Sequence, residues 1–170
     1  MKIFIGGSKM ISDIDENIKK RLNEFMRCNH EIIIGDCWGI DAAAQKYLYE
    51  NNYPDVIIYA SGNMVRNNIG NFKVSDIPAD GKKGFEFYRQ KDIAMTNDAD
   101  CGFMIWDGKS KGTLNNIIDL MERKKSVDVY LTYNSTFYTL SANGFLKNDT
   151  IKELGGVIYD AYVDVMDALK

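Results

Sequence analysis

The chain has 170 residues, with 21 Lys and Arg against 24 Asp and Glu, so its formal net charge at pH 7 is −3. This length suits one domain, or one domain with a short appendage, and the hydrophobic and charged shares of 45% and 26% are typical of a globular protein. The acidic balance argues against a non-specific nucleic-acid binder, and without a long apolar run or a signal-peptide pattern we expect a cytosolic protein.

Three short apolar runs in the first 60 residues alternate with two helical patterns. The runs are Ile3–Ile5, Ile32–Ile34 and Val56–Tyr59. Ser12 and Asp15 form a capping-box pattern before the first helix, and Asp41 is expected to cap the second. Strand, helix, strand, helix, strand predicts a parallel sheet with helices on both of its faces.

The pattern lapses from Ser61 to Phe85, where no period is clear. A loop of this length is either a lid or binding loop, or a poorly ordered segment, and both alternatives stay open. A helix is expected over Glu86–Asn97 and a strand over Gly102–Trp106. A further helix around Leu114–Met121 and a fifth strand over Val127–Leu131 complete the pattern.

The end of the chain differs from what precedes it. Thr136–Leu140 is expected to form an extra short strand, and a helical spacing of apolar residues starts at Ile151. We therefore divide the chain into a domain over 1–132 and an extension over 133–170. The extension either packs on its own domain or mediates self-association, which would make a homodimer.

The residue types that often carry chemistry are scarce. Cys28, Cys37 and Cys101 contain no C-x-x-C pair, which argues against a structural zinc site and favours free, mostly buried thiols. The single histidine, His30, directly precedes the second strand and so lies at the amino edge of the sheet. Triad chemistry is disfavoured for that reason, and Cys37, with no histidine nearby, is expected to be a packed thiol.

Ligands of an open parallel sheet bind at the carboxyl ends of its strands. The turns expected to meet at that edge are Gly6–Lys9, Gly35–Asp41, Ala60–Asn63 and Asp107–Thr113. Three of them place glycine beside Ser, Thr or Asp at a helix start, where unpaired amides and the helix dipole attract anions such as phosphate. The bland alternative for the last turn is a polar connection with Thr113 as the helix N-cap.

These turns resemble the SLOG superfamily. The similar motifs are Gly7-Ser8, Gly35-x-x-x-Gly39-Ile40-Asp41 and Trp106-Asp107-Gly108-x-Ser110-x-Gly112-Thr113, within Met1 to Leu131. The YspA-like branch fits best, and the superfamily also includes the Lonely Guy phosphoribohydrolases and a DNA-processing protein. The resemblance implies a Rossmann-like, doubly wound parallel sheet of five strands in the order 3-2-1-4-5, followed by a C-terminal strand and helix.

The resemblance also implies a pocket for a nucleotide or a nucleotide derivative, such as a nucleotide sugar or an ADP-ribose-like molecule. Gly112 and Thr113 would meet the phosphate. The other expected ligand-binding residues are Gly7, Ser8, Lys9, Gly35, Asp36, Gly39, Asp41, Lys91, Gly108, Ser110, Lys111 and Asn116. No cofactor and no metal ion are expected.

The chain departs from the family pattern at two places. Members often carry Arg-Asn on the helix before the Gly102–Trp106 strand, where this chain has Lys91-Asp92, so the ligand is expected to differ and to present a ribose hydroxyl to Asp92. Related hydrolases carry a glutamate soon after Gly-Thr, where this chain has Asn116, which cannot act as base or nucleophile. Binding is therefore the leading hypothesis.

Two other hypotheses stay open. The first is an N-glycosidic hydrolase or transferase acting on nucleosides or nucleotides, with Asp92 or Asp107 as its catalytic carboxylate. The second is a DNA-handling protein, which rests on the superfamily alone and conflicts with the acidic charge balance.

Overall fold

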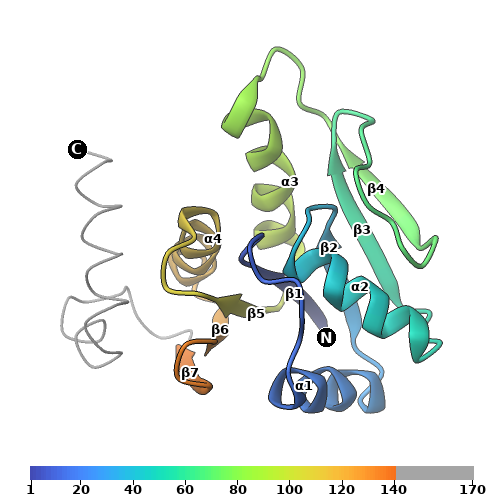
Figure 1. Ribbon diagram of the computed structural model, residues 1–170. Helices are drawn as coiled ribbons and strands as arrows, with labels where there is room; N and C mark the ends of the chain where they lie inside the picture. The colour runs from blue at the N-terminus through green and yellow to red at the C-terminus, as the bar shows by residue number, and fades with distance from the viewer. Residues whose placement is uncertain (141–170) are drawn as a thin grey trace.

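The computed structural model describes residues 1–140 and shows an α/β fold in which one sheet carries helices on both faces (Figure 1). The strands are β1 (Lys2–Gly7), β2 (Glu31–Gly35), β3 (Val56–Ser61), β4 (Lys73–Ile77), β5 (Cys101–Trp106), β6 (Ser126–Leu131) and β7 (Thr136–Leu140). The helices are α1 (Glu16–Arg27), α2 (Ile40–Glu50), α3 (Gly84–Asp98) and α4 (Lys111–Glu122).

The described part of the chain forms a seven-stranded sheet in the order β4-β3-β2-β1-β5-β6-β7. All neighbours pair in parallel except β7, which runs antiparallel to β6. The central strands are continuous apolar runs such as Ile32–Ile34, whose three side chains are all fully buried. Such runs are expected where both faces of a parallel sheet are covered.

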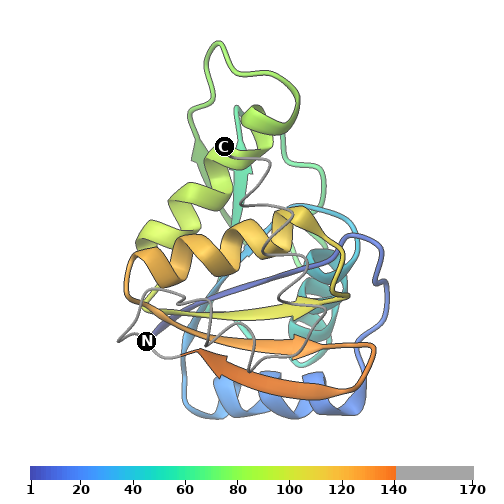
Figure 2. The ribbon, with the colours of Figure 1, turned by 90° about the vertical axis from the view of Figure 1, so that its left-hand side faces the viewer.

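Each face of the sheet has its own core. Alternation along β1 sends Ile3 and Ile5 into the core beneath α1 and α2, while Phe4 joins the core beneath α3 and α4. Figure 2 shows α3 and α4 lying side by side across the second face, where they also contact each other. All six parallel strands therefore deliver their carboxyl ends to one edge.

The five-stranded sheet in the order 3-2-1-4-5 is wrong in strand count, and therefore in order. The five expected strands form the middle of the sheet as β3-β2-β1-β5-β6, but β4 and β7 extend it at the two edges. β4 lies inside the segment predicted to be a loop and pairs with β3 from Ile57↔Lys73 to Ser61↔Ile77. Its side chains are mostly exposed, so it lacks the apolar pattern on which a strand prediction depends.

The expected extension begins inside the sheet. Thr136–Leu140 forms the strand predicted there and pairs with β6, with Leu140 opposite Val127 at the amino edge. The helix expected from Ile151 onward, and with it most of the proposed extension 133–170, lies outside the described residues.

Helix starts differ from expectation in detail. Asp15 is the N-cap of α1 and accepts hydrogen bonds from the backbone N–H groups of Asn17 and Ile18, whereas Ser12 lies outside the helix. The N-cap of α2 is Gly39 rather than Asp41, and the N-cap of α4 is Ser110 rather than Thr113. Among residues 1–140, no helix combines the length and apolarity needed to cross a membrane.

Candidate functional site

A pocket of about 660 Å³ opens at the carboxyl edge of the sheet. The turns that follow β1, β2 and β5 form its floor, and α3 and the connection between β3 and β4 form one wall. Its lining residues are Phe4, Gly6, Gly7, Ser8, Lys9, Met10, Cys37, Asp41, Arg66, Phe85, Tyr88, Lys91, Asp92, Met95, Asp107, Lys109, Ser110, Lys111, Gly112, Thr113 and Asn116.

The turns after β1 and β5 are tied together by Ser8. Its buried hydroxyl oxygen accepts a hydrogen bond from the backbone N–H of Asp107 at 3.2 Å, and its own N–H donates to the carbonyl of Ile105 at 3.0 Å. Gly7 must remain small, because a Cβ there would collide with the Ile105 carbonyl and with Ile40 of α2. The two turns therefore form one rigid rim of the pocket.

Asp107 shapes the start of α4. One of its carboxylate oxygens accepts from the backbone N–H groups of Lys109 at 2.9 Å and Ser110 at 2.8 Å. Partial burial opposes ionisation, but these donors outweigh it, so the pKa of Asp107 lies below its ordinary value. An ionised, backbone-bound carboxylate is poorly suited to donate a proton, so the predicted catalytic role of Asp107 loses support to a turn-forming one.

The N-terminus of α4 forms the cationic side of the pocket. The Ser110 hydroxyl caps the helix by accepting from the Thr113 N–H at 3.3 Å, and the indole N–H of Trp106 donates to the Ser110 carbonyl at 3.0 Å. A Cβ on Gly112 would meet no atom within 4 Å, so this residue faces open space in the pocket. Exposed lysines stand around this helix start, namely Lys9, Lys109 and Lys111.

The residues that α2 and α3 bring to the pocket include a buried lysine with two carboxylates nearby. Lys91 Nζ lies 2.8 Å from Asp92 Oδ1, and Asp41 accepts a hydrogen bond from the Cys37 N–H at 3.1 Å. Gly35 provides the room, because a Cβ there would lie 2.5 Å from Asp41 Oδ2 and 2.6 Å from Lys91 Nζ. Because both atoms lie this close to the same Cβ position, the distance between Asp41 Oδ2 and Lys91 Nζ is at most about 5.1 Å.

Burial and charge act in opposite directions on this cluster. Burial raises the pKa of Asp41 to about 6, and the negative charge of Asp92 adds to the rise, while Lys91 limits it. Burial alone would lower the pKa of Lys91, but the carboxylates of Asp92 and Asp41 outweigh it and raise that pKa above its ordinary value. Lys91 is therefore charged at neutral pH, whereas the carboxyl group of Asp41 changes its protonation state near pH 6.

A second buried ion pair supports the wall of the pocket. Arg66 donates to both carboxylate oxygens of Asp36, through Nε at 3.2 Å and a terminal nitrogen at 2.6 Å. Burial would raise the pKa of Asp36, but the bonds from Arg66 hold it below its ordinary value. The Arg66 guanidinium also stacks over the ring of Tyr88, 4.2 Å from its centre, which joins the β3–β4 connection to α3.

Most of the predicted site residues line this pocket, and four do not. The twelve that line it are Gly7, Ser8, Lys9, Asp41, Lys91, Asp92, Asp107, Ser110, Lys111, Gly112, Thr113 and Asn116. Gly35, Asp36, Gly39 and Gly108 are not among the lining residues. Gly35 makes room for the ion cluster, Asp36 holds Arg66, and Gly39 adopts a φ of +73° where its turn packs on the backbone of Lys9.

Sequence reasoning missed the residues that the long segment after β3 and the start of α3 bring to the pocket. Arg66, Phe85 and Tyr88 fall within or just after the stretch that has no period. Only the isolated positive charge of Arg66, in a segment rich in Asn and Gly, could have drawn attention to it. Asn116 does line the pocket, but its side-chain oxygen also accepts a hydrogen bond from Arg89 at 3.3 Å.

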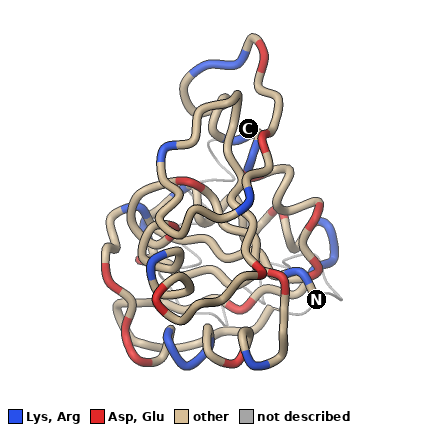
Figure 3. Tube along the Cα trace, turned by 90° about the vertical axis from the view of Figure 1, so that its right-hand side faces the viewer, with Lys and Arg blue, Asp and Glu red and all other residues tan. Residues whose placement is uncertain are grey.

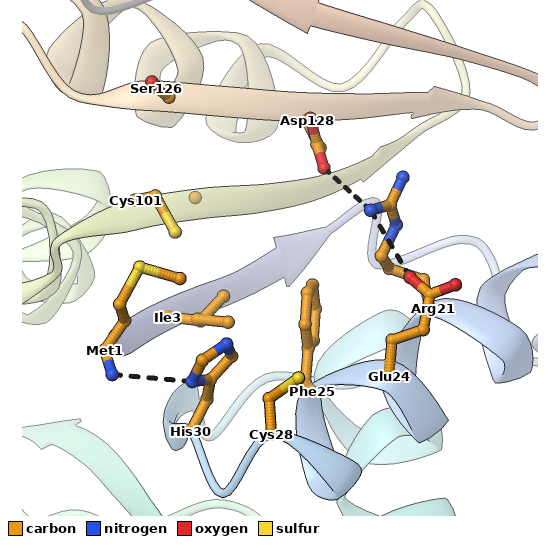
Figure 4. A pocket seen from close by; sticks show the side chains of 11 residues that line it. Met1, Ile3, Arg21, Glu24, Phe25, Cys28, His30, Cys101, Ser126 and Asp128 are labelled. Atoms are coloured by element: carbon orange, nitrogen blue, oxygen red, sulfur yellow. Dashed lines mark hydrogen bonds and ion pairs between the residues drawn. The ribbon is translucent and has the colours of Figure 1, made fainter.

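His30, Cys28 and Cys101 lie away from the carboxyl-edge pocket, and Cys37 is the one cysteine of the described residues that lines it. His30 lies at the amino edge, as predicted, in a separate pocket of about 300 Å³ with Met1, Phe25, Cys28 and Cys101 (Figure 4). The three cysteines are free, as expected, but Cys28 is exposed and Cys37 and Cys101 are only partly buried, so the expectation of mostly buried thiols is wrong. Burial raises the pKa of the Cys37 thiol, which disfavours the nucleophilic thiolate.

Metal binding finds no support at either pocket. Within residues 1–140, no three His, Cys, Asp or Glu side chains come together in a way that could hold a metal ion. In comparisons with known proteins, no protein-family model matches this chain, and no curated protein matches it either.

Proposed function

We propose that this protein is a Rossmann-like domain, similar to the SLOG superfamily, that binds a nucleotide or a nucleotide-derived small molecule. The carboxyl-edge pocket of about 660 Å³ is the observation that carries the proposal. Its volume suits a small organic ligand, and a helix start with a small residue and nearby lysines is the environment that phosphate prefers. The described fold, with helices on both faces of a parallel sheet, places the pocket where such folds bind ligands.

The two ends of the pocket suit two parts of one ligand. Exposed lysines and the open face of Gly112 would receive a phosphate at the start of α4. Asp92 and Asp41, which line the same pocket, offer carboxylate oxygens to hydroxyl groups such as those of a ribose. Tyr88 and Phe85 add exposed aromatic surface at the mouth, on which a planar base could stack.

A thermal-shift and calorimetric screen tests the proposal. The full chain is titrated with nucleoside mono- and diphosphates, a nucleotide sugar and ADP-ribose, and at least one of them is expected to raise the melting temperature and bind with a measurable Kd. Gly112→Val adds a side chain to the open face of the pocket and should weaken that binding by tenfold or more. The matched control is Asn115→Val, which lies about one helical turn further along α4 and does not line the pocket.

The result that would overturn the proposal is plain. Either no compound in the screen binds, or Gly112→Val binds as tightly as Asn115→Val and the original chain. A second pair of variants separates the lysines from general charge effects, since Lys111→Glu changes the pocket and Lys20→Glu changes the exposed surface of α1. Only the first should weaken binding.

N-glycosidic hydrolysis or transfer is a second candidate, and one observation favours it. Asp41 and Asp92 are two carboxylates on the same wall, and burial raises the pKa of Asp41 to about 6, within the range useful for acid–base catalysis. Incubation with nucleosides and nucleoside monophosphates, followed by chromatography for free base, tests it. Activity that survives both Asp41→Asn and Asp92→Asn would reject this pair.

We further propose that the protein is cytosolic and that nucleic acid is not its ligand. Figure 3 shows acidic and basic residues interspersed along the described chain. This arrangement does not provide the continuous basic face that a nucleic-acid binder uses. Retention of single-stranded DNA by the full chain in a gel-shift assay at low salt would contradict the proposal that nucleic acid is not the ligand.

Self-association as a homodimer is a further proposal, which analytical ultracentrifugation would test.

A further inference from the structure

The ion cluster formed by Asp41, Lys91 and Asp92 does not balance its own charge. One ammonium pairs with Asp92 and lies near Asp41, and these groups come from α2 and α3, which pack on opposite faces of the sheet. The neighbouring pair of Asp36 and Arg66 is already matched one to one. With Asp41 ionised the cluster therefore carries one surplus negative charge, and with Asp41 protonated it carries none.

This surplus charge lies in the wall of the pocket rather than apart from it. Asp41 and Lys91 are 6% and 4% exposed, and both line the pocket. An anion bound at the start of α4 lies in the same pocket as Asp41 and Asp92, so its negative charge adds to theirs. In surroundings that exclude most water, the repulsion between the anion and an ionised Asp41 is screened far less than at the surface.

We propose that an anion bound in this pocket favours protonation of the Asp41 carboxylate to the neutral carboxylic acid, so that a fraction of a proton equivalent is taken up from solvent on binding. The proposal rests on the proposed function, because it needs an anionic ligand in this pocket. No other bond is made or broken, since the proton comes from water or buffer and leaves again when the anion dissociates. Asp41 would thus couple the affinity for the ligand to pH.

The charged groups around Asp41 decide the direction of the coupling. Asp36 lies in the adjoining turn, Lys91 and Asp92 face it from α3, and Lys9 lines the same pocket from the turn after β1. Burial already raises the pKa of Asp41 to about 6, and a bound anion would add negative charge that raises it further. The affinity for the anion should therefore be highest below pH 6, where Asp41 is protonated. It should fall as the pH rises through the pKa of Asp41 in the complex, and level off above that pKa.

Sulfate is the probe for the test, because it stays fully ionised over this pH range whereas phosphate and nucleotides titrate. The full chain is labelled with carbon-13 at its aspartate carboxyls, and their shifts are followed by NMR from about pH 4.5 to 8, with and without saturating sodium sulfate. Sodium chloride of equal ionic strength replaces sulfate in the reference. The Asp41 signal is assigned in the unmodified chain through its bonded backbone atoms, and its loss in Asp41→Asn checks the assignment.

The expected result has two parts. Saturating sulfate should raise the pKa of Asp41 by about one unit. Because one pKa unit corresponds to a tenfold change in an equilibrium constant, the Kd for sulfate should rise about tenfold between pH 5.5 and pH 8. In Asp41→Asn the Kd should lose this pH dependence, while Asp55→Asn, an exposed carboxylate ahead of β3, should keep it. If Asp41→Asn does not fold, the shift of the Asp41 signal in the unmodified chain still decides.

The failures of the two proposals can be told apart. If sulfate binds but leaves the Asp41 titration unchanged, or if Asp41→Asn keeps the pH dependence, this inference is overturned while the proposed function stands. If neither sulfate nor any nucleotide binds at any pH, both are overturned.

Discussion

Asp41 Oδ2 and Lys91 Nζ lie 2.5 and 2.6 Å from the position that a Cβ on Gly35 would occupy. The absence of a side chain at the end of β2 thus allows a carboxylate from α2 and an ammonium from α3 to approach each other across the edge of the sheet. This meeting of two helices over one glycine organises the acidic wall of the pocket.

Gly35→Ala tests this relationship directly. The added methyl group would displace the ends of these two side chains, and we expect it to lower the free energy of unfolding by about 1 kcal/mol, the low end of what overpacking costs, because both side chains are flexible. Chemical denaturation measures the change. Gly112→Ala is the matched control, because a Cβ there meets nothing within 4 Å, and it should leave the stability equal or slightly higher. Equal effects of the two substitutions would contradict the packing argument.

Asp41→Asn should change how stability depends on pH. Burial raises the folded-state pKa of Asp41 to about 6, above its unfolded value, so its contribution to stability is greatest below about pH 4 and is lost as the pH rises to 6. The loss amounts to at most about 3 kcal/mol. Asn resembles the neutral form, so the stability of Asp41→Asn relative to the original chain should improve between pH 4 and pH 7. A constant difference across this range would refute the raised pKa.

Arg66→Met should destabilise the fold by about 3 kcal/mol at pH 7, because Asp36 would remain buried without its partner. Bonds from Arg66 lower the pKa of Asp36 despite burial, so this stabilisation is present above the unfolded pKa and is lost as the pH falls through the folded one. The effect of the substitution should therefore shrink near pH 3. Lys46→Met removes only an exposed pair with Glu50 and should cost about 0.5 kcal/mol or less.

Asp107 provides a test that separates turn formation from catalysis. Asp107→Asn keeps a side-chain oxygen for the N–H groups of Lys109 and Ser110 and should leave the stability within about 0.5 kcal/mol. Asp107→Ala removes that acceptor and should cost about 1 kcal/mol in thermal or chemical unfolding. If a ligand or an activity is found, Asp107→Asn should preserve it, and its loss in a folded Asp107→Asn protein would restore Asp107 as a reacting group.

The pattern of buried runs and helical periods was sufficient to predict six of the seven described strands, and it placed most of the expected site residues at the edge where the pocket lies. The segments Ile32–Ile34 and Gly102–Trp106 are covered on both faces of the sheet, and their continuous apolar sequences are what such burial requires. β4 could not be found in this way. It is held by backbone hydrogen bonds to β3 at an exposed edge, and such bonds leave little trace in side-chain type.

The acidic net charge and the scarcity of histidine and cysteine were properties of the sequence by itself, as were the glycine-bearing turns and the helix starts beside them. Sequence could not tell which of the many aspartates would be buried, paired or bound to backbone, because these states depend on contacts between distant segments. Asp36 meets Arg66 across 30 residues, and Asp41 lies near a lysine 50 residues away. Only the tertiary structure brings these charges together, and the exclusion of water around them decides which carboxylate stays ionised and which one titrates near neutral pH.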